Sequence, residues 1–238
     1  MKKFNYKVFT SLLALGVGLV GLASNNASAD QSALMKYSVA LIGDMPYDAK
    51  GVTQTPSVIN DINANSNIKF SLFDGDTMSG KGDKCTDDNY TRIKKDFFDL
   101  FTNQVFYSVG DNEWVDCDRA VKGAFDPNDR LAKVRSIFFG NASNGYVQLG
   151  KNKAGTTVLH DANYPEMQMF SYRKITYIIS HVPGSANNSA VASPQFKTYN
   201  DTAKDGDDAE FKARDAANVA WINKGFAKAK SEGSIGVI

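Results

Sequence analysis

Three stretches decide the fold of this chain: Tyr37-Ser-Val-Ala-Leu-Ile-Gly43-Asp44, Ile68-Lys-Phe-Ser-Leu-Phe73-Asp-Gly-Asp76 and Gln104-Val-Phe-Tyr-Ser-Val109-Gly-Asp111. Each is a short, largely apolar run that leads into a glycine and an aspartate, which is typical of a buried strand that ends in a turn. Amphipathic stretches separate them. Strands that alternate with helices predict an α/β domain whose layers pack around a central sheet.

Apolar residues at helical spacing predict four helices, and two later runs predict a pair of antiparallel strands. The helices are expected over 57–65, 88–102, 128–138 and 207–230, and the strands over 166–172 and 175–180. Ser57 has the residue type of an N-cap for the first helix. The last helix should stop at Gly233 and bury Ala217, Trp221 and Phe226.

The first thirty residues have the features of a Sec-type signal peptide. A start with three lysines and no acid precedes an apolar run from Ser11 to Ala23, and small residues end at Ala29. This order predicts cleavage after Ala29. A membrane anchor is the alternative, but a run of about a dozen residues is short for a helix that spans a bilayer. We therefore expect a signal peptide over 1–29, a domain over 30–238, and a periplasmic or secreted protein.

Composition limits the partners of the cleaved chain. Removing 29 residues from 238 leaves 209, which suits a single domain. Cleavage removes three of 27 basic residues and none of 26 acidic ones, so the formal charge changes from +1 to −2. This balance indicates no nucleic-acid partner, and no later segment is apolar enough for a membrane anchor. Residues 234–238 begin like another strand, so we expect the native domain to continue beyond Ile238.

The chain has two cysteines, Cys85 and Cys117. Export would place them where disulfides form and persist, so a bond between them is expected, with two free thiols as the alternative. Neither lies in a C-x-x-C motif or beside a histidine, which disfavours a zinc site. The bond would tie the loop after the second strand to the loop after the third.

The three strand ends predict a cluster of acids. Ligand sites in open α/β sheets form at the carboxyl ends of the strands, so Asp44, Asp76 and Asp111 should meet at one edge. Carboxylates that converge repel each other and are stabilised by a cation. Ordinary turn chemistry explains a single Gly-Asp strand end equally well. Three in succession favour a metal site.

These blocks resemble the signature of the calcineurin-like metallophosphoesterases. The first three blocks of that family read D-x-H, G-D-x-x-D/G and G-N-H-E/D; here they stand as Gly43-Asp44, Gly75-Asp76 and Gly110-Asp-Asn-Glu113. The likeness is greatest to a secreted bacterial branch whose third block reads G-D-N-E-W-x-D-C, here Gly110 to Cys117. That branch also has an H-V-x-G-S-x-N block, here His181 to Asn187, and an A-A-N-x-A-W helix, here Ala216 to Trp221.

The resemblance, which covers the chain from residue 37 onward, implies a fold and an activity. The fold is a two-sheet α/β/β/α sandwich, here expected to lack its C-terminal strands. Asp44 would bind one metal ion, Asp76 would bridge two, and Asp111 would bind the second. Two divalent ions (Mn, Fe, Zn or Mg) would then grip a phosphoester substrate and supply the hydroxide that attacks phosphorus.

The sequence departs from the family pattern in ways that bear on catalysis. Pro46 stands where the D-x-H block has a histidine, whereas Asp111 in place of asparagine preserves an oxygen ligand. Asn112 occupies the catalytic position of the histidine that assists the leaving group, and an amide cannot supply that proton. The closing G-H-x-H block has no counterpart. The sequence therefore favours an exported phosphoester hydrolase, with a catalytically degenerate binding protein as the alternative.

Five other residues are candidates for the site or its walls. His181 ends an apolar strand and is expected to be a metal ligand or general acid, or else a histidine bonded within its loop. Glu113 and Asp116 would either orient the ligands from behind or be solvated loop acids. Trp114 is expected to anchor the loop rather than line a pocket. His160 lies in a polar stretch and is expected at the surface.

Overall fold

The computed structural model describes residues 36–189 and 206–238. The chain divides into two compact units, Met1–Lys36 and Tyr37–Ile238, and every element below belongs to the second. The predicted signal peptide, residues 1–29, lies outside the described residues. Within the two described ranges, no helix combines the length and the apolar character needed to cross a membrane.

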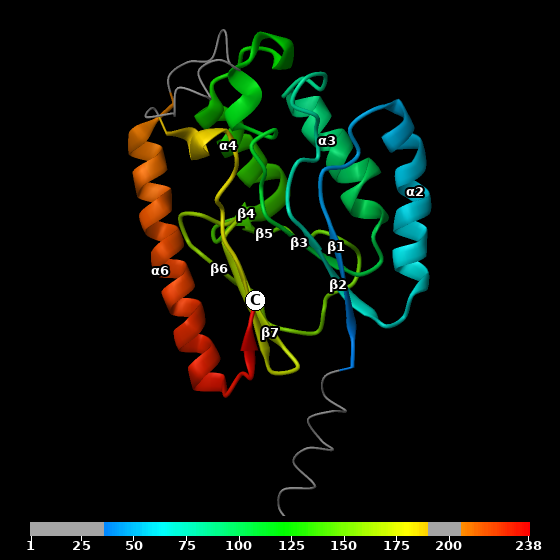
Figure 1. Ribbon diagram of the computed structural model, residues 1–238, viewed down its shortest axis with the longest axis vertical. Coiled ribbons are helices and arrows are strands. Elements are labelled where there is room, and N and C mark those ends of the chain that lie inside the picture. Colours follow the sequence, from blue (N-terminus) through cyan, green and yellow to red (C-terminus); the bar gives the residue numbers. More distant parts are fainter. Residues whose placement is uncertain (1–35, 190–205) are drawn as a thin grey trace, which may run out of the picture. The chain divides into compact units, whose positions relative to one another are not determined.

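Three parallel strands form the first sheet, in the order β1–β2–β3 (Figure 1). They are β1 (Ser38–Ile42), β2 (Ile68–Phe73) and β3 (Gln104–Tyr107), close to the predicted bounds. Ile42 pairs with Phe73, and Phe73 pairs with Tyr107. This register brings the three strands to an end at the same edge of the sheet, so the three Gly-Asp sequences leave from neighbouring positions.

The second sheet has four strands in the order β6–β7–β8–β9. They are β6 (Leu159–His160), β7 (Gln168–Tyr172), β8 (Ile175–Ile179) and β9 (Gly236–Val237). The predicted antiparallel pair is confirmed as β7 and β8, and β9 joins β8 in parallel. A separate hairpin pairs β4 (Gly140–Asn141) with β5 (Gly145–Tyr146).

The helix that follows β1 begins earlier than predicted. It is α2 (Ala49–Ala64), and its N-cap is Asp48, whose Oδ1 accepts a hydrogen bond from the Gly51 N–H at 2.6 Å. The prediction of Ser57 as N-cap is therefore wrong, and Pro56 lies inside the helix. An aspartate caps first-turn N–H groups as well as a serine does, so the sequence also allowed Asp48 to be predicted as the N-cap.

Two of the middle helices are shorter than predicted because each changes its winding near its end. α3 (Asp87–Asp96) is followed by a 3₁₀ helix at Phe98–Leu100. α4 (Pro127–Val134) is followed by a π-helical turn at Arg135–Phe139. The apolar spacing continues through these turns, which explains why the sequence predicts longer helices.

The last helix, α6 (Asp208–Glu232), ends as predicted at Gly233, whose φ of +62° is the left-handed conformation of a helix C-cap. Trp221 is 2% exposed, as expected, but Phe226 is 57% exposed, so its predicted burial is wrong. The buried face instead includes two polar side chains, Arg214 and Asn218. Apolar periodicity cannot select a face of this composition.

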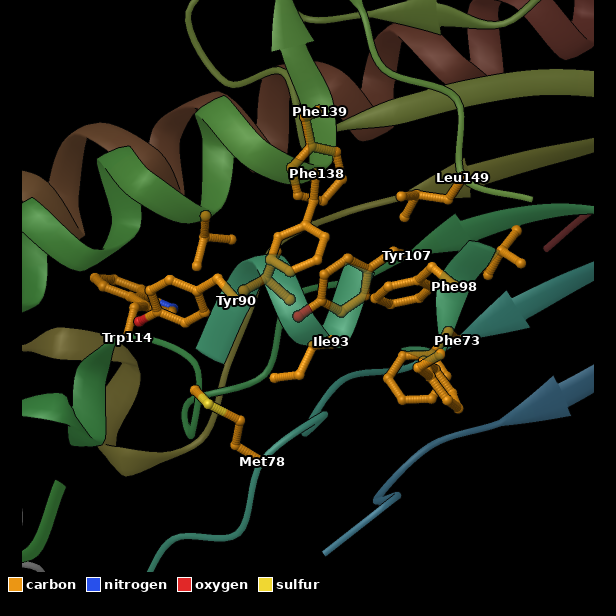
Figure 2. Close-up of a cluster of buried hydrophobic side chains, with 14 of the residues drawn as sticks. Phe73, Met78, Tyr90, Ile93, Phe98, Tyr107, Trp114, Phe138, Phe139 and Leu149 are labelled. Atoms are coloured by element: carbon orange, nitrogen blue, oxygen red, sulfur yellow. The ribbon is translucent and has the colours of Figure 1, made fainter. Parts of the chain in front are cut away.

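Apolar contacts hold these elements in layers. A cluster between the two sheets contains Phe70, Phe106, Phe170 and Tyr177, and the Phe106 and Phe170 rings stack at 3.8 Å between centroids. The other face of the first sheet carries the largest cluster, where Tyr107 of β3 meets α3 and the segment around α4 (Figure 2). α6 packs through Trp221 on the second sheet. The chain is thus a mixed α/β domain, as predicted.

Candidate functional site

The carboxyl edge of the first sheet holds Asp44, Asp76 and Asp111, each just beyond its strand. The Asp44 N–H donates to the Gly75 carbonyl at 3.0 Å. The Asn112 N–H donates to Asp76 Oδ1 at 3.3 Å. These bonds join the first strand end to the second and the second to the third, so the structure brings the three predicted ligand residues to one edge.

Glycines give the acids room at this edge. A Cβ atom at Gly110 would lie 2.0 Å from Asp76 Oδ1, and one at Gly184 would lie 2.4 Å from Asp111 Oδ2. Asp44 and Asp76 themselves have φ values of +54° and +61°, a conformation that costs non-glycine residues energy. The edge therefore keeps its carboxylates in place against local backbone preference.

Asp76 lies in a strongly acidic environment. Burial raises its pKa, the carboxylates of Glu113, Asp111 and Asp44 raise it further, and the result is a pKa of about 8. The Asn112 N–H opposes the shift. Burial and neighbouring carboxylates therefore dominate the pKa of Asp76. Cations act on its neighbours instead: Lys122 lowers the pKa of Glu113, and Arg119 and Lys122 lower that of Asp116.

Tyr47 supports the first aspartate. Its hydroxyl donates to Asp44 Oδ1 at 2.7 Å. Burial raises the pKa of Tyr47, and its hydrogen bond to Asp44 and the neighbouring acids raise it further, so the phenol stays neutral and remains a donor. The tyrosine lies between β1 and α2, in a loop that sequence reasoning did not assign to the site.

Glu113 is fully buried behind Asp76, which excludes the expectation of a solvated loop acid. Its Oε1 accepts hydrogen bonds from the backbone N–H of Thr77 and from the Thr77 hydroxyl, the latter at 2.7 Å. Its Oε2 is enclosed and has no partner among the described residues. Burial raises the pKa of Glu113 against the lowering effects of Thr77 and Lys122. Burial thus favours the neutral form of this carboxyl, which lies behind the ligand edge.

Asp111 and Asp116 share one hydroxyl. The Ser185 Oγ lies 2.7 Å from Asp111 Oδ2 and 2.6 Å from Asp116 Oδ1. A hydroxyl donates a single hydrogen, so one carboxyl must bring its own proton or leave one contact unsatisfied. Burial and the Asp111 charge raise the pKa of Asp116 to about 6, although Arg119 lies 2.6 Å away. The H-V-P-G-S block thus reaches the acids through its serine.

His181 is fully buried and belongs to a charged network behind this block. Its Nδ1 lies 2.9 Å from Glu166 Oε1, and Arg135 donates two hydrogen bonds to the same carboxylate. Burial raises the pKa of Glu166, but the bonds from His181 and Arg135 outweigh it and hold the pKa at about 2. Glu166 is therefore ionised, and the alternative of a histidine bonded to its own loop is not what the structure shows.

The same contact fixes the protonation of His181. Because ionised Glu166 only accepts, the histidine Nδ1 carries the hydrogen, and burial lowers the pKa of the ring so that it is neutral. The Nε2 atom then has a free lone pair, and it has no partner among the described residues. A carboxylate that orients a neutral histidine is the usual arrangement behind a metal-binding imidazole. The Ser108 hydroxyl donates to the Ser180 carbonyl at 2.9 Å, so this strand end adjoins that of β3.

The two cysteines form the expected disulfide, Cys85–Cys117, and the alternative of free thiols is excluded. Cys117 lies in a 3₁₀ helix at Val115–Asp118, and Cys85 lies just before α3. The bond ties the loop after β2 to the loop after β3. Trp114, fully buried and 5.4 Å from His181 between ring centroids, anchors the same loop as predicted (Figure 2).

The donor set of this edge fits a hard divalent cation. Carboxylate oxygens dominate it, and these suit Mg²⁺, Mn²⁺ or Ca²⁺, with a nitrogen from His181 extending the choice to Zn²⁺ or Fe. The raised pKa of Asp76 reflects its burial and the carboxylates around it. Across residues 36–189 and 206–238, however, no three His, Cys, Asp or Glu side chains already lie close enough to hold a metal ion. Ligation would therefore require side-chain movements.

Comparison of the chain with protein-family models, with curated proteins and with solved structures gives no match. Sequence reasoning missed three residues that shape the site, Tyr47, Thr77 and Ser185. Ser185 lies within the quoted H-V-x-G-S-x-N block, which was the one available signal.

Proposed function

We propose that the chain is a metal-dependent phosphoester hydrolase of the calcineurin-like metallophosphoesterase type, with Asp44, Asp76 and Asp111 as its metal ligands. The convergence of acids at the strand edge carries this proposal, because burial and three carboxylates raise the pKa of Asp76 to about 8. A divalent cation relieves such repulsion. The two sheets that share an aromatic layer also support the α/β/β/α sandwich of that family.

The three aspartates act as a set in this proposal. Asp44, Asp76 and Asp111 would together hold two divalent ions (Mn, Fe, Zn or Mg). Metal ions bound there supply electrophilic activation of the phosphate and lower the pKa of water. Tyr47 fixes the Asp44 carboxylate through its hydroxyl, and Ser185 fixes Asp111. Both neutral donors orient an oxygen without removing its negative charge.

Asn112 and His181 have different chemical roles in this proposal. The Asn112 side chain can donate a hydrogen bond to a phosphate or leaving-group oxygen, but it cannot transfer a proton. His181 has its Nδ1 proton directed at Glu166 and none on Nε2, so it suits a metal ligand better than a general acid. A leaving group that departs without protonation, such as a phenolate, is therefore the favoured substrate class.

The rival function is that of a catalytically degenerate binding protein. Pro46 and Asn112 stand where the family has histidines, which favours this rival. It predicts that a metal ion or ligand binds at the edge while phosphoesters are not turned over. In either case we propose an exported protein, periplasmic or secreted, whose ligand is a phosphoester rather than a nucleic acid or a membrane.

The test is metal content measured by elemental mass spectrometry, followed by turnover of aryl phosphate monoesters and diesters. The purified protein should hold about two metal ions per chain, as a dinuclear site requires. Asp76→Asn should lose most of them, whereas Asp61→Asn, on an exposed acid of α2, should lose none. Metal without turnover would establish the rival. No metal in the unmodified protein would overturn the hydrolase proposal and favour a binding protein that uses no metal ion.

A further inference from the structure

A second cavity lies at the amino end of β3, the end opposite the carboxylate edge. Its volume is about 350 Å³, within the range of small-molecule sites. Val105 of β3 bridges to Leu149, and both residues line the most buried part of the cavity. Tyr146 and Lys153 line it where it opens to solvent.

Two glutamines line this cavity with unpaired amide groups. Gln104 is 8% exposed and Gln168 is 6% exposed. Gln104 Oε1 accepts from the Ala154 N–H at 2.8 Å, which leaves its NH₂ group without a partner among the described residues. The Gln168 amide makes no hydrogen bond to the described part of the chain. Neither amide is among the enclosed polar atoms that lack a partner, so both groups reach the open space of the cavity and are available to a ligand.

A flat aromatic surface lies beside the amides. The rings of Tyr146 and His160 stack at 3.9 Å between centroids and 6° between planes. His160 is half-buried, which corrects its predicted place at the surface. Its Nδ1 lies 3.0 Å from the Pro165 carbonyl, which can only accept, so the ring keeps its proton there and offers Nε2 as an acceptor. Tyr146 is 40% exposed and leaves room for another ring.

The charge of the lining selects against cations. Lys153 is the one formally charged side chain among the lining residues, and no aspartate or glutamate is present. Lys153 lies at the exposed rim, whereas the amides lie deep. A fitting ligand therefore has a flat polar part that enters the cavity and an anionic part that stays at its mouth.

We propose that this cavity binds a nucleoside monophosphate. The base would lie against the Tyr146–His160 pair with its edge at the Gln104 and Gln168 amides, which offer the donor and acceptor pattern that glutamine uses to pair with adenine. The phosphate would contact Lys153. The cavity is distinct from the carboxylate edge, so the proposal does not depend on the hydrolase function.

Calorimetric titration tests the proposal, with the Asp76→Asn protein used to prevent turnover at the carboxylate edge. The probes are AMP, CMP, adenosine and ribose 5-phosphate. AMP or CMP should bind more tightly than ribose 5-phosphate. Lys153→Ala should weaken binding of the nucleotide about tenfold and leave adenosine unchanged, because only the phosphate contact is lost. Lys151→Ala, on a neighbouring exposed lysine that does not line the cavity, is the matched control.

Gln168→Met should weaken nucleotide and nucleoside alike, because it removes the deep amide at similar volume. If that variant does not fold, Tyr146→Ala on the exposed hairpin replaces it and should have the same effect. The proposal is overturned if no probe binds, if ribose 5-phosphate binds as tightly as AMP, or if AMP binding is the same in the lysine and cavity variants as in their parent.

Discussion

Asp76 is half-buried and Glu166 is fully buried, and their surroundings shift their pKa values in opposite directions. Asp76 lies among other carboxylates and has a pKa of about 8. Glu166 lies between His181 and Arg135 and has a pKa of about 2. Burial raises the pKa in both cases, so the neighbouring charges decide the outcome.

The two regions therefore differ in charge balance: opposite charges surround Glu166, whereas other acids surround Asp76. The Glu166 network satisfies its own charge and positions His181, so its role is structural. The edge around Asp76 gathers carboxylates, and its cations, Lys122 and Arg119, act on Glu113 and Asp116, so the raised pKa of Asp76 lowers stability unless a ligand binds. Regions that give up stability in this way are often functional sites.

Asp76→Asn should have the largest effect, and it tests the carboxylate edge. Under saturating Mn²⁺ the variant should lose more than about 100-fold in turnover of aryl phosphates, since even residues behind metal ligands are worth 10–100-fold. In a chelating buffer at pH 7 it should melt at a higher temperature than the parent protein, because the amide avoids the cost of the raised carboxyl pKa. Unchanged turnover together with an unchanged melting temperature would show that Asp76 neither binds a catalytic metal ion nor destabilises the metal-free protein.

Glu166→Gln tests the charged network of Glu166, His181 and Arg135. Removing one partner of a buried charged network should lower the free energy of unfolding by about 3 kcal/mol at pH 7, measured by urea titration. The matched control is Glu232→Gln, on a more exposed acid paired with Lys228, which should cost less than about 1 kcal/mol. Equal costs for the two variants would show that burial of Glu166 adds nothing.

The unfolding free energies of the parent protein and of Glu166→Gln should also depend differently on pH. The pKa of Glu166 is about 2 in the folded protein and 4.5 in its ordinary state, so its stabilising effect is full above about pH 5. The effect is lost as the pH falls toward 2. The stability difference between the parent protein and Glu166→Gln should therefore shrink by about 3 kcal/mol between pH 6 and pH 2, at about 1.4 kcal/mol per pKa unit. A difference that stays constant with pH would contradict it.

Ser185→Ala should have the smallest effect. It removes the hydroxyl that joins Asp111 to Asp116, at a cost of about 1 kcal/mol in unfolding free energy. Metal affinity, measured by competition with a chromogenic chelator, should fall several-fold because Asp111 is less well oriented. Ser136→Ala, on an exposed serine that bonds only its own helix, should change neither quantity.

The strands of the first sheet and their acids were legible in the sequence because the signals are local. An apolar run followed by Gly-Asp specifies a strand and its turn within about eight residues. The parallel register then brings Asp44, Asp76 and Asp111 to one edge without further information. The Cys85–Cys117 bond was predictable for a different reason, since a chain with two cysteines allows one pairing within itself.

Contacts between residues far apart in the chain could not be predicted from the sequence. Ser185 meets Asp111 across 74 positions, and Gln104 and Gln168 line one cavity from two sheets. Neither follows from spacing along the chain. The exposure of Phe226 was also mispredicted, because α6 buries Arg214 and Asn218, whose side chains bond to the His181 carbonyl.

The sequence by itself determined where strands end, which acids follow them and how the cysteines pair, because backbone conformation and residue type set these properties over a few residues. Only the tertiary structure decided which carboxylates are neutralised. Glu166 and Asp76 have the same chemistry in the sequence, and their charge states differ because folding brings Arg135 and His181 to one and further acids to the other. Electrostatic energies depend on distance in space, which the order of residues does not encode.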